Sequence, residues 1–191
     1  GEYRKVEAEK VVKLKAAESQ RLAVLLATIA PFRKNRQFNM GIKMLEDERF
    51  EHPLLKQRHA DELHIWRASE TFIDTLIADL NTFGYTGPVT ESRSLKIVAA
   101  DRLQLTHRFG AQGEGKIPFD QLMGRALLVI AEKISQNFLP GSPDYLTRQE
   151  SMALFAYMIE DWDVAKSAGE KIKGEVFQEL WSRIFVPSRR N

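Results

Sequence analysis

The sequence predicts an all-α fold, an irregular bundle of about seven helices. Apolar residues recur every three or four positions over most of the 191 residues, the spacing that gives a helix one apolar face. Short segments rich in proline and glycine separate these periodic stretches. Hydrophobic residues make up 43% of the chain and charged residues 28%, which excludes a disordered polypeptide.

The first predicted helix is long and strongly charged. It covers residues 2–30, and we expect Pro31 to end it because proline lacks an amide hydrogen and disfavours helix in the residue before it. Its first half is too polar to be buried, so this half should project from the core or pair with another helix. One apolar stripe runs along it, formed by Val11, Leu14, Leu22, Leu25 and Ile29.

Two more helices are predicted before the middle of the chain. A short helix covers residues 42–50, and a long amphipathic helix covers residues 54–82. The pair Gly87-Pro88 then makes a turn. We predict a single helical domain over residues 1–191, with subdomains 1–88 and 89–191 as the alternative.

Residues 90–109 fit two patterns. Apolar residues at helical spacing between Leu95 and Leu103 suit a helix, whereas the alternation of Leu103 and Leu105 suits a strand. We favour a helix and keep a short β-hairpin near 94–108 as the alternative.

The second half of the chain contains four further predicted helices, the last of them over residues 175–185. Residues 118–138 are apolar on nearly all sides, which places this helix in the middle of the bundle. Thr147 and Glu150 match a capping box, so we expect a helix to begin there. Asp161 or Asp163 should cap the next helix.

Composition narrows the class of protein. The chain has no cysteine, which excludes disulfides, a thiolate nucleophile and a cysteine-based zinc site. We therefore expect a reducing, cytoplasmic location. No apolar run approaches the ~20 residues needed to cross a bilayer, so this segment should not insert into a membrane. The chain begins Gly1-Glu2-Tyr3, without methionine, and we expect it to be part of a larger protein, which could be membrane-anchored.

Two motifs suggest a phosphate site and a metal site, but residues within or beside each motif argue against it. Residues 110–116, GAQGEGK, match the spacing of a phosphate-binding loop, but Ile117 stands where a hydroxyl should ligate magnesium. We predict a flexible connection and no cofactor. Seven residues mix histidine with carboxylates, and Pro53 divides them, so we predict no metal site. They are Glu48, Glu51, His52, His59, Asp61, Glu62 and His64.

Basic residues near aromatic ones form the remaining pattern. Cationic grooves with stacking aromatics bind single-stranded nucleic acid, although a net charge of +2 is weak for that role. These residues are the predicted contacts to a partner or to nucleic acid: Arg33, Lys34, Arg36, Arg102, Arg108, Arg189 and Arg190.

No catalytic arrangement is evident. Ser69 and Ser94 lack the context of a nucleophile elbow, and His107 has no recognisable partner. We therefore predict no catalytic residues and a non-enzymatic helical interaction or adaptor domain, which docks a protein partner or self-associates. Nucleic-acid binding through residues 33–36 and 102–108 is the first alternative. A metal-dependent helical enzyme at His52 and His59 is the second.

Overall fold

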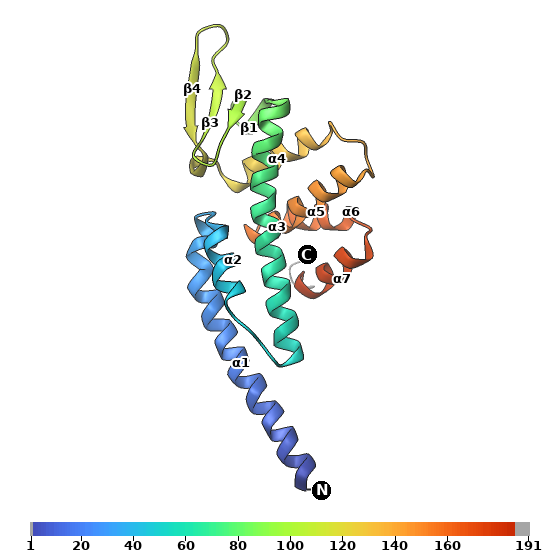
Figure 1. Ribbon diagram of the computed structural model, residues 1–191. Helices are drawn as coiled ribbons and strands as arrows, with labels where there is room; N and C mark the ends of the chain where they lie inside the picture. The colour runs from blue at the N-terminus through green and yellow to red at the C-terminus, as the bar shows by residue number, and fades with distance from the viewer. Residues whose placement is uncertain (1, 186–191) are drawn as a thin grey trace. The chain divides into compact units, whose positions relative to one another are not determined.

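The computed structural model describes residues 2–185 (Figure 1). It contains seven α-helices in that range and one four-stranded antiparallel sheet, so the mostly helical prediction is confirmed and its all-α form is incomplete. The chain divides into two compact units, Gly1–Arg67 and Ala68–Asn191. The division falls within helix α3 (Pro53–Phe83). No helix among the described residues is both long and apolar enough to cross a membrane.

The first unit contains α1 (Glu2–Lys34), α2 (Phe38–Glu46) and the beginning of α3. The predicted stripe of α1 is buried at Leu22, Leu25 and Ile29. Pro31 lies inside α1, so the prediction that it ends the helix is wrong. Its carbonyl accepts the amide of Asn35 at 3.1 Å, and only three residues of α1 follow it, so the helix loses little by including it.

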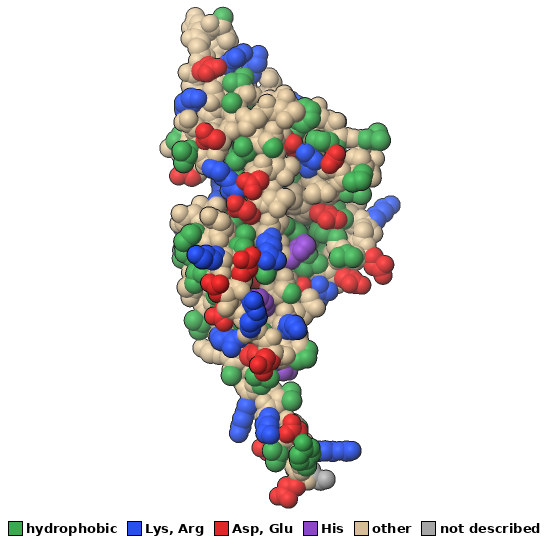
Figure 2. Space-filling model, in the orientation of Figure 1, with side chains coloured by type: hydrophobic (Ala, Val, Ile, Leu, Met, Phe, Trp, Pro, Cys, Tyr) green, Lys and Arg blue, Asp and Glu red, His purple; other side chains and the backbone are tan. Residues whose placement is uncertain are grey.

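The first turns of α1 have no packing partner within the described part of the first unit. Every side chain from Glu2 to Lys13 is exposed, which confirms that this half is not buried. Figure 2 shows basic, acidic and apolar side chains interleaved at this end of the molecule. Tyr3 is 80% exposed and Val6 is 46% exposed. A helix face that includes large apolar residues is therefore open to solvent.

Glu18 ties the middle of α1 to the connection that precedes α3. Its carboxylate accepts the backbone N–H of Glu51 at 2.8 Å and that of His52 at 2.9 Å. Burial by itself raises the pKa of the Glu18 carboxyl, but these two donors, with Arg21 and His52 nearby, outweigh burial and hold that pKa below its ordinary value. The ionised form is thus the one that the fold stabilises.

We expect Glu18→Gln to destabilise the protein at neutral pH and to matter less in acid. A carboxyl whose pKa is depressed in the folded state contributes stability above its unfolded pKa, near 4.5, and loses it as the pH falls through the folded value. Urea denaturation of both proteins over a pH series measures the difference between their unfolding free energies. A difference that stays constant below pH 4.5 would contradict this role for the charge.

The second unit begins within α3 and continues into a sheet. Strands β1 (Tyr85–Thr90), β2 (Arg93–Ala100), β3 (Gln104–Arg108) and β4 (Glu114–Pro118) pair in sequence order, all antiparallel. The helix favoured for residues 90–109 is therefore wrong. The alternative hairpin near 94–108 is β2 and β3, to which β1 and β4 add an outer strand on each side. Cross-strand pairing and one buried face, with Leu95, Ile97 and Leu105, outweigh the local helical spacing.

The glycine-rich segment 110–116 joins β3 to β4. Gly110 and Gly113 adopt positive φ angles, and the amide of Phe109 bonds to the carbonyl of Gly113. Lys116 lies in β4, where its Nζ donates to the Thr106 hydroxyl at 2.7 Å. A phosphate-binding loop leads into a helix, whereas this one leads into a strand. The segment is therefore a hairpin connection.

Four helices complete the unit after a 3-10 turn at Phe119–Gln121. They are α4 (Gly124–Ser135), α5 (Pro143–Met158), α6 (Trp162–Lys171) and α7 (Glu175–Ile184). Asp161 caps α6 by accepting the amide of Val164, as predicted. The predicted capping box is wrong, because Ser142 caps α5 and Thr147 lies inside that helix. Pro143 suits the first helical position, which explains the earlier start.

Candidate protein-docking groove

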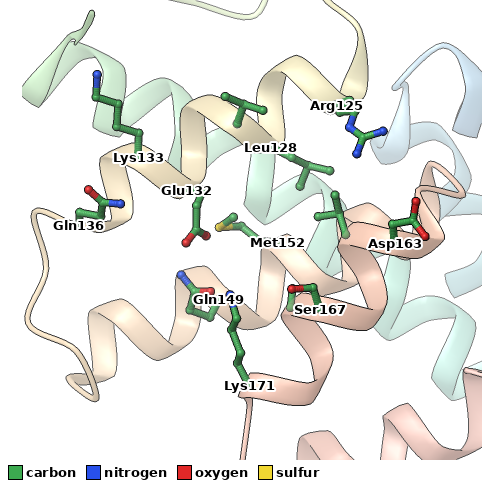
Figure 3. Close-up of a pocket in the computed structure, with 13 residues that line it drawn as sticks. Arg125, Leu128, Glu132, Lys133, Gln136, Gln149, Met152, Asp163, Ser167 and Lys171 are labelled. Atoms are coloured by element: carbon green, nitrogen blue, oxygen red, sulfur yellow. The ribbon is translucent and has the colours of Figure 1, made fainter. Parts of the chain in front are cut away.

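Helices α4, α5 and α6 of the second unit enclose an open groove with a volume of about 730 Å³ (Figure 3). Side chains of α4 and α6 form its two walls, and buried side chains of α5 form its floor. Its volume lies in the range of known ligand sites, roughly 300–1,000 Å³. It is lined by Arg125, Leu128, Val129, Glu132, Lys133, Gln136, Gln149, Met152, Asp163, Val164, Ser167, Ala168 and Lys171.

Helical spacing explains why these residues share the groove. Along α4 the lining residues recur at intervals of three or four, which places them on one face of the helix. Residues 163–171 of α6 follow the same spacing. The centre of the groove is apolar, since Met152 and Leu128 are buried there and Val129 stays 43% exposed. An exposed apolar side chain beside a buried apolar floor is typical of a binding surface.

Gln149 presents a hydrogen-bond acceptor at the floor. The Ser135 hydroxyl donates its only proton to the carbonyl of Glu132 at 2.6 Å, so its oxygen accepts from Gln149 Nε2 at 3.3 Å. This fixes the orientation of the Gln149 amide, which is only 4% exposed. The Oε1 atom of Gln149 accepts no hydrogen bond from residues 2–185. Every fully buried side-chain N or O atom in that range has a hydrogen-bond partner, so this oxygen is not fully buried. This oxygen is therefore open to the groove.

Charged side chains of both signs surround the apolar centre. Arg125 lies 3.7 Å from Asp161, and Lys133 donates to the carbonyl of Thr86. Within the described chain, the side chains of Glu132, Asp163 and Lys171 form no hydrogen bond or ion pair. Figure 3 shows Glu132 pointing from α4 toward α5 and Lys171 extending from α6 toward Gln149. These unpaired groups are available to a bound partner.

The basic residues predicted as contacts lie elsewhere, and three belong to the first unit. Arg33 and Lys34 end α1, and Arg36 occupies the following turn with a φ of 57°. Arg33 is half-buried close to Glu62. Burial raises the pKa of the Glu62 carboxyl, and the positive charge of Arg33 opposes that rise. The charge of Arg33 therefore acts on a carboxyl group of its own unit.

Of two other predicted contacts, Arg102 lies in the connection that precedes β3 and Arg108 is the last residue of that strand. Arg102 pairs with Glu70 and Asp74, both at 2.5 Å, and Arg108 lies 3.5 Å from Glu114. Carboxylates thus offset both charges, and nucleic-acid binding stays a prediction. Arg189 and Arg190 lie outside the described residues.

Two histidines of the predicted histidine and carboxylate cluster have partners in the first unit. His59 Nε2 lies 2.7 Å from the carbonyl of Leu45, and His52 Nδ1 accepts the amide of Leu54. Over residues 2–185 no three His, Asp or Glu side chains gather closely enough to hold a metal ion. The metal-dependent alternative therefore has no ligand set in that range.

Comparison with protein-family models, with curated proteins and with solved structures finds no match to this chain. The groove was also missed by sequence reasoning, because none of its residues forms a motif. The available signal was the mixed face of residues 125–136, where polar residues interrupt an apolar helix. Only the packing of α5 and α6 against it shows that this face lines a groove.

Proposed function

We propose that this chain is a non-enzymatic interaction domain that docks an amphipathic helix of a protein partner in the α4–α5–α6 groove. The observation that carries the proposal is the apolar centre at Val129 and Met152, framed by polar side chains without partners in the described chain. A helix laid into an apolar groove is a common mode of peptide recognition.

The dimensions of the groove suit a helix. Lining residues extend from Arg125 to Gln136, the residue that caps the end of α4, which is 11 residues, or about 16 Å at 1.5 Å per residue. Three turns of a docked helix would fill that length. Helices pack by placing the side-chain ridges of one between those of its neighbour, and two helical walls offer such ridges on both sides.

The lining residues favour binding over catalysis. Ser167 is the one hydroxyl among them, and no histidine lines the groove to activate it. Glu132 and Asp163 are separated along the walls, with Asp163 near the Arg125 end in Figure 3. These features support an interaction surface.

We expect Val129→Arg to weaken helix binding at least about ten-fold, because it places a charge over the apolar centre. The side chain is 43% exposed, so the fold should tolerate the change. The measurement is fluorescence anisotropy with helical peptides selected from a display library against the parent protein. Leu146→Arg is the matched control, since Leu146 is 41% exposed and lies outside the groove. Selected peptides that bind Val129→Arg as tightly as the parent would contradict the proposal.

A further inference from the structure

The exposed end of α1 has the properties of a helix that docks in a groove. Tyr3, Val6, Lys10, Leu14 and Ala17 follow one another at intervals of three or four residues and so share one face. Tyr3 is 80% exposed and the Lys10 side chain is 68% exposed. Lys10 pairs with Glu7 at 3.0 Å, but both side chains are in water, where such a pair contributes little.

The groove presents the complementary arrangement. Beside its apolar centre lie an unpaired acid, Glu132, and an unpaired base, Lys171, while the other unpaired acid, Asp163, lies near the Arg125 end (Figure 3). The open Oε1 of Gln149 is a second acceptor for a donor group, and in Figure 3 it lies between the side chains of Glu132 and Lys171. A helix that carries a base and an acid one turn apart would satisfy all three groups.

Length and charge match between the two surfaces. The groove is about 16 Å long from Arg125 to Gln136, which accommodates 11 residues of a helix and so holds Tyr3 to Leu14 with Glu7 and Lys10 between them. Lys10 and Glu7 on the helix are opposite in sign to Glu132 and Lys171 in the groove. Charge pairs that lose their water on binding determine the register of a complex and the choice of partner more than they raise its affinity.

We propose that the occupant of the groove is residues 3–14 of α1 from a second copy of this chain. Lys10 of one copy meets Glu132 and Gln149 of the other, and Glu7 meets Lys171. This proposal rests on the proposed function and identifies the partner that binds the groove as another copy of the chain. The two surfaces differ, so the contact is heterologous and builds a ring, a filament or a reciprocal pair of copies.

Charge reversal tests the proposal by light scattering of the full chain over a concentration series. The parent protein should associate. Lys10→Glu alone and Glu132→Lys alone should each raise the dissociation constant at least about ten-fold, because each brings like charges together. The combined variant Lys10→Glu with Glu132→Lys should recover most of the association.

Mixing the two single variants is the sharper test. The Lys10→Glu chain keeps an intact groove and the Glu132→Lys chain keeps an intact α1, and the two altered surfaces are complementary to each other. An equimolar mixture should therefore associate at concentrations at which neither variant associates alone. Matched controls are Lys5→Glu, on another face of α1, and Glu170→Lys, which lies outside the groove on α6. Circular dichroism confirms that each variant is folded.

The outcomes separate this inference from the proposed function. A parent protein that stays monomeric, or association that persists in both single variants, overturns the inference. If library peptides still bind in a way that depends on Val129, the proposed function stands and the partner is another protein. If neither the α1 segment nor any selected peptide binds at the groove, both proposals fail.

Discussion

Asp79→Ala is expected to destabilise the second unit by about 3–5 kcal/mol, the range for breaking a buried ion pair by removing one partner. Asp79 on α3 accepts two parallel hydrogen bonds from Arg148 on α5, both at 2.8 Å. Their side chains are only 11% and 19% exposed, so solvent screens the pair little. The pair joins two helices that are far apart in the sequence.

The large effect comes from the arginine that remains. Arg148 also lies over the ring of Phe138, 3.7 Å from its centre, and donates to the carbonyl of Asp144. These contacts hold its guanidinium in place when the carboxylate is removed. A charge left without its partner in a mostly buried site costs more than the intact pair contributes.

Urea denaturation followed by circular dichroism measures the loss. Asp74→Ala is the matched control on the same helix. Asp74 pairs with Arg102 but is 64% exposed, so its removal should change stability by less than about 1 kcal/mol. The double variant Asp79→Leu with Arg148→Met should recover much of the loss, because no charge is left buried. Equal effects of Asp79→Ala and Asp74→Ala would contradict the argument.

Gly41→Ala should destabilise the first unit by about 2 kcal/mol, although alanine favours helices. A Cβ added at Gly41 would lie 2.1 Å from Cζ3 of Trp66, well inside van der Waals contact. Trp66 is 2% exposed and packs edge-on against Phe38, so it has little room to move. Overpacking of this kind costs about 1–3 kcal/mol or more and exceeds the gain in helix propensity of about 1 kcal/mol.

Hydrogen exchange of the amides of α2 locates the effect, since local opening of that helix should become more frequent. Lys43→Ala is the matched control, because Lys43 is exposed on the same helix. Pairing Gly41→Ala with Trp66→Leu should cause less loss than the sum of the two single changes, because the smaller side chain removes the clash. Additive losses would show that the indole does not limit this position.

Most of the helices could be predicted from the sequence because their signals are local. The stripe of α1 at Leu22, Leu25 and Ile29 and the cap at Asp161 depend on residues within a few positions of one another. The wrong predictions concern segments whose conformation depends on contacts between residues distant in the sequence. Residues 90–109 form strands because neighbouring strands pair with them and bury one face, although their own spacing also suited a helix.

The groove lay beyond prediction for the same reason. Val129, Gln149 and Lys171 are ordinary residues on three helices, and their meeting depends on how α4, α5 and α6 pack. The predicted basic contacts show the opposite error. Their charge made Arg102 and Arg108 candidates for binding a partner, but in the fold both form ion pairs with carboxylates of the same chain. A charge pattern does not reveal which partners the fold will supply.

By itself the sequence determined the helical class, the exposed charged end of α1 and the absence of cysteine chemistry. Those properties follow from residue type and from spacing over one or two turns. The tertiary structure alone decided the sheet, the buried pair of Asp79 and Arg148, and the groove with its unpaired Glu132 and Lys171. Each of these requires side chains that are distant in the chain to meet, and local spacing carries no information about that meeting.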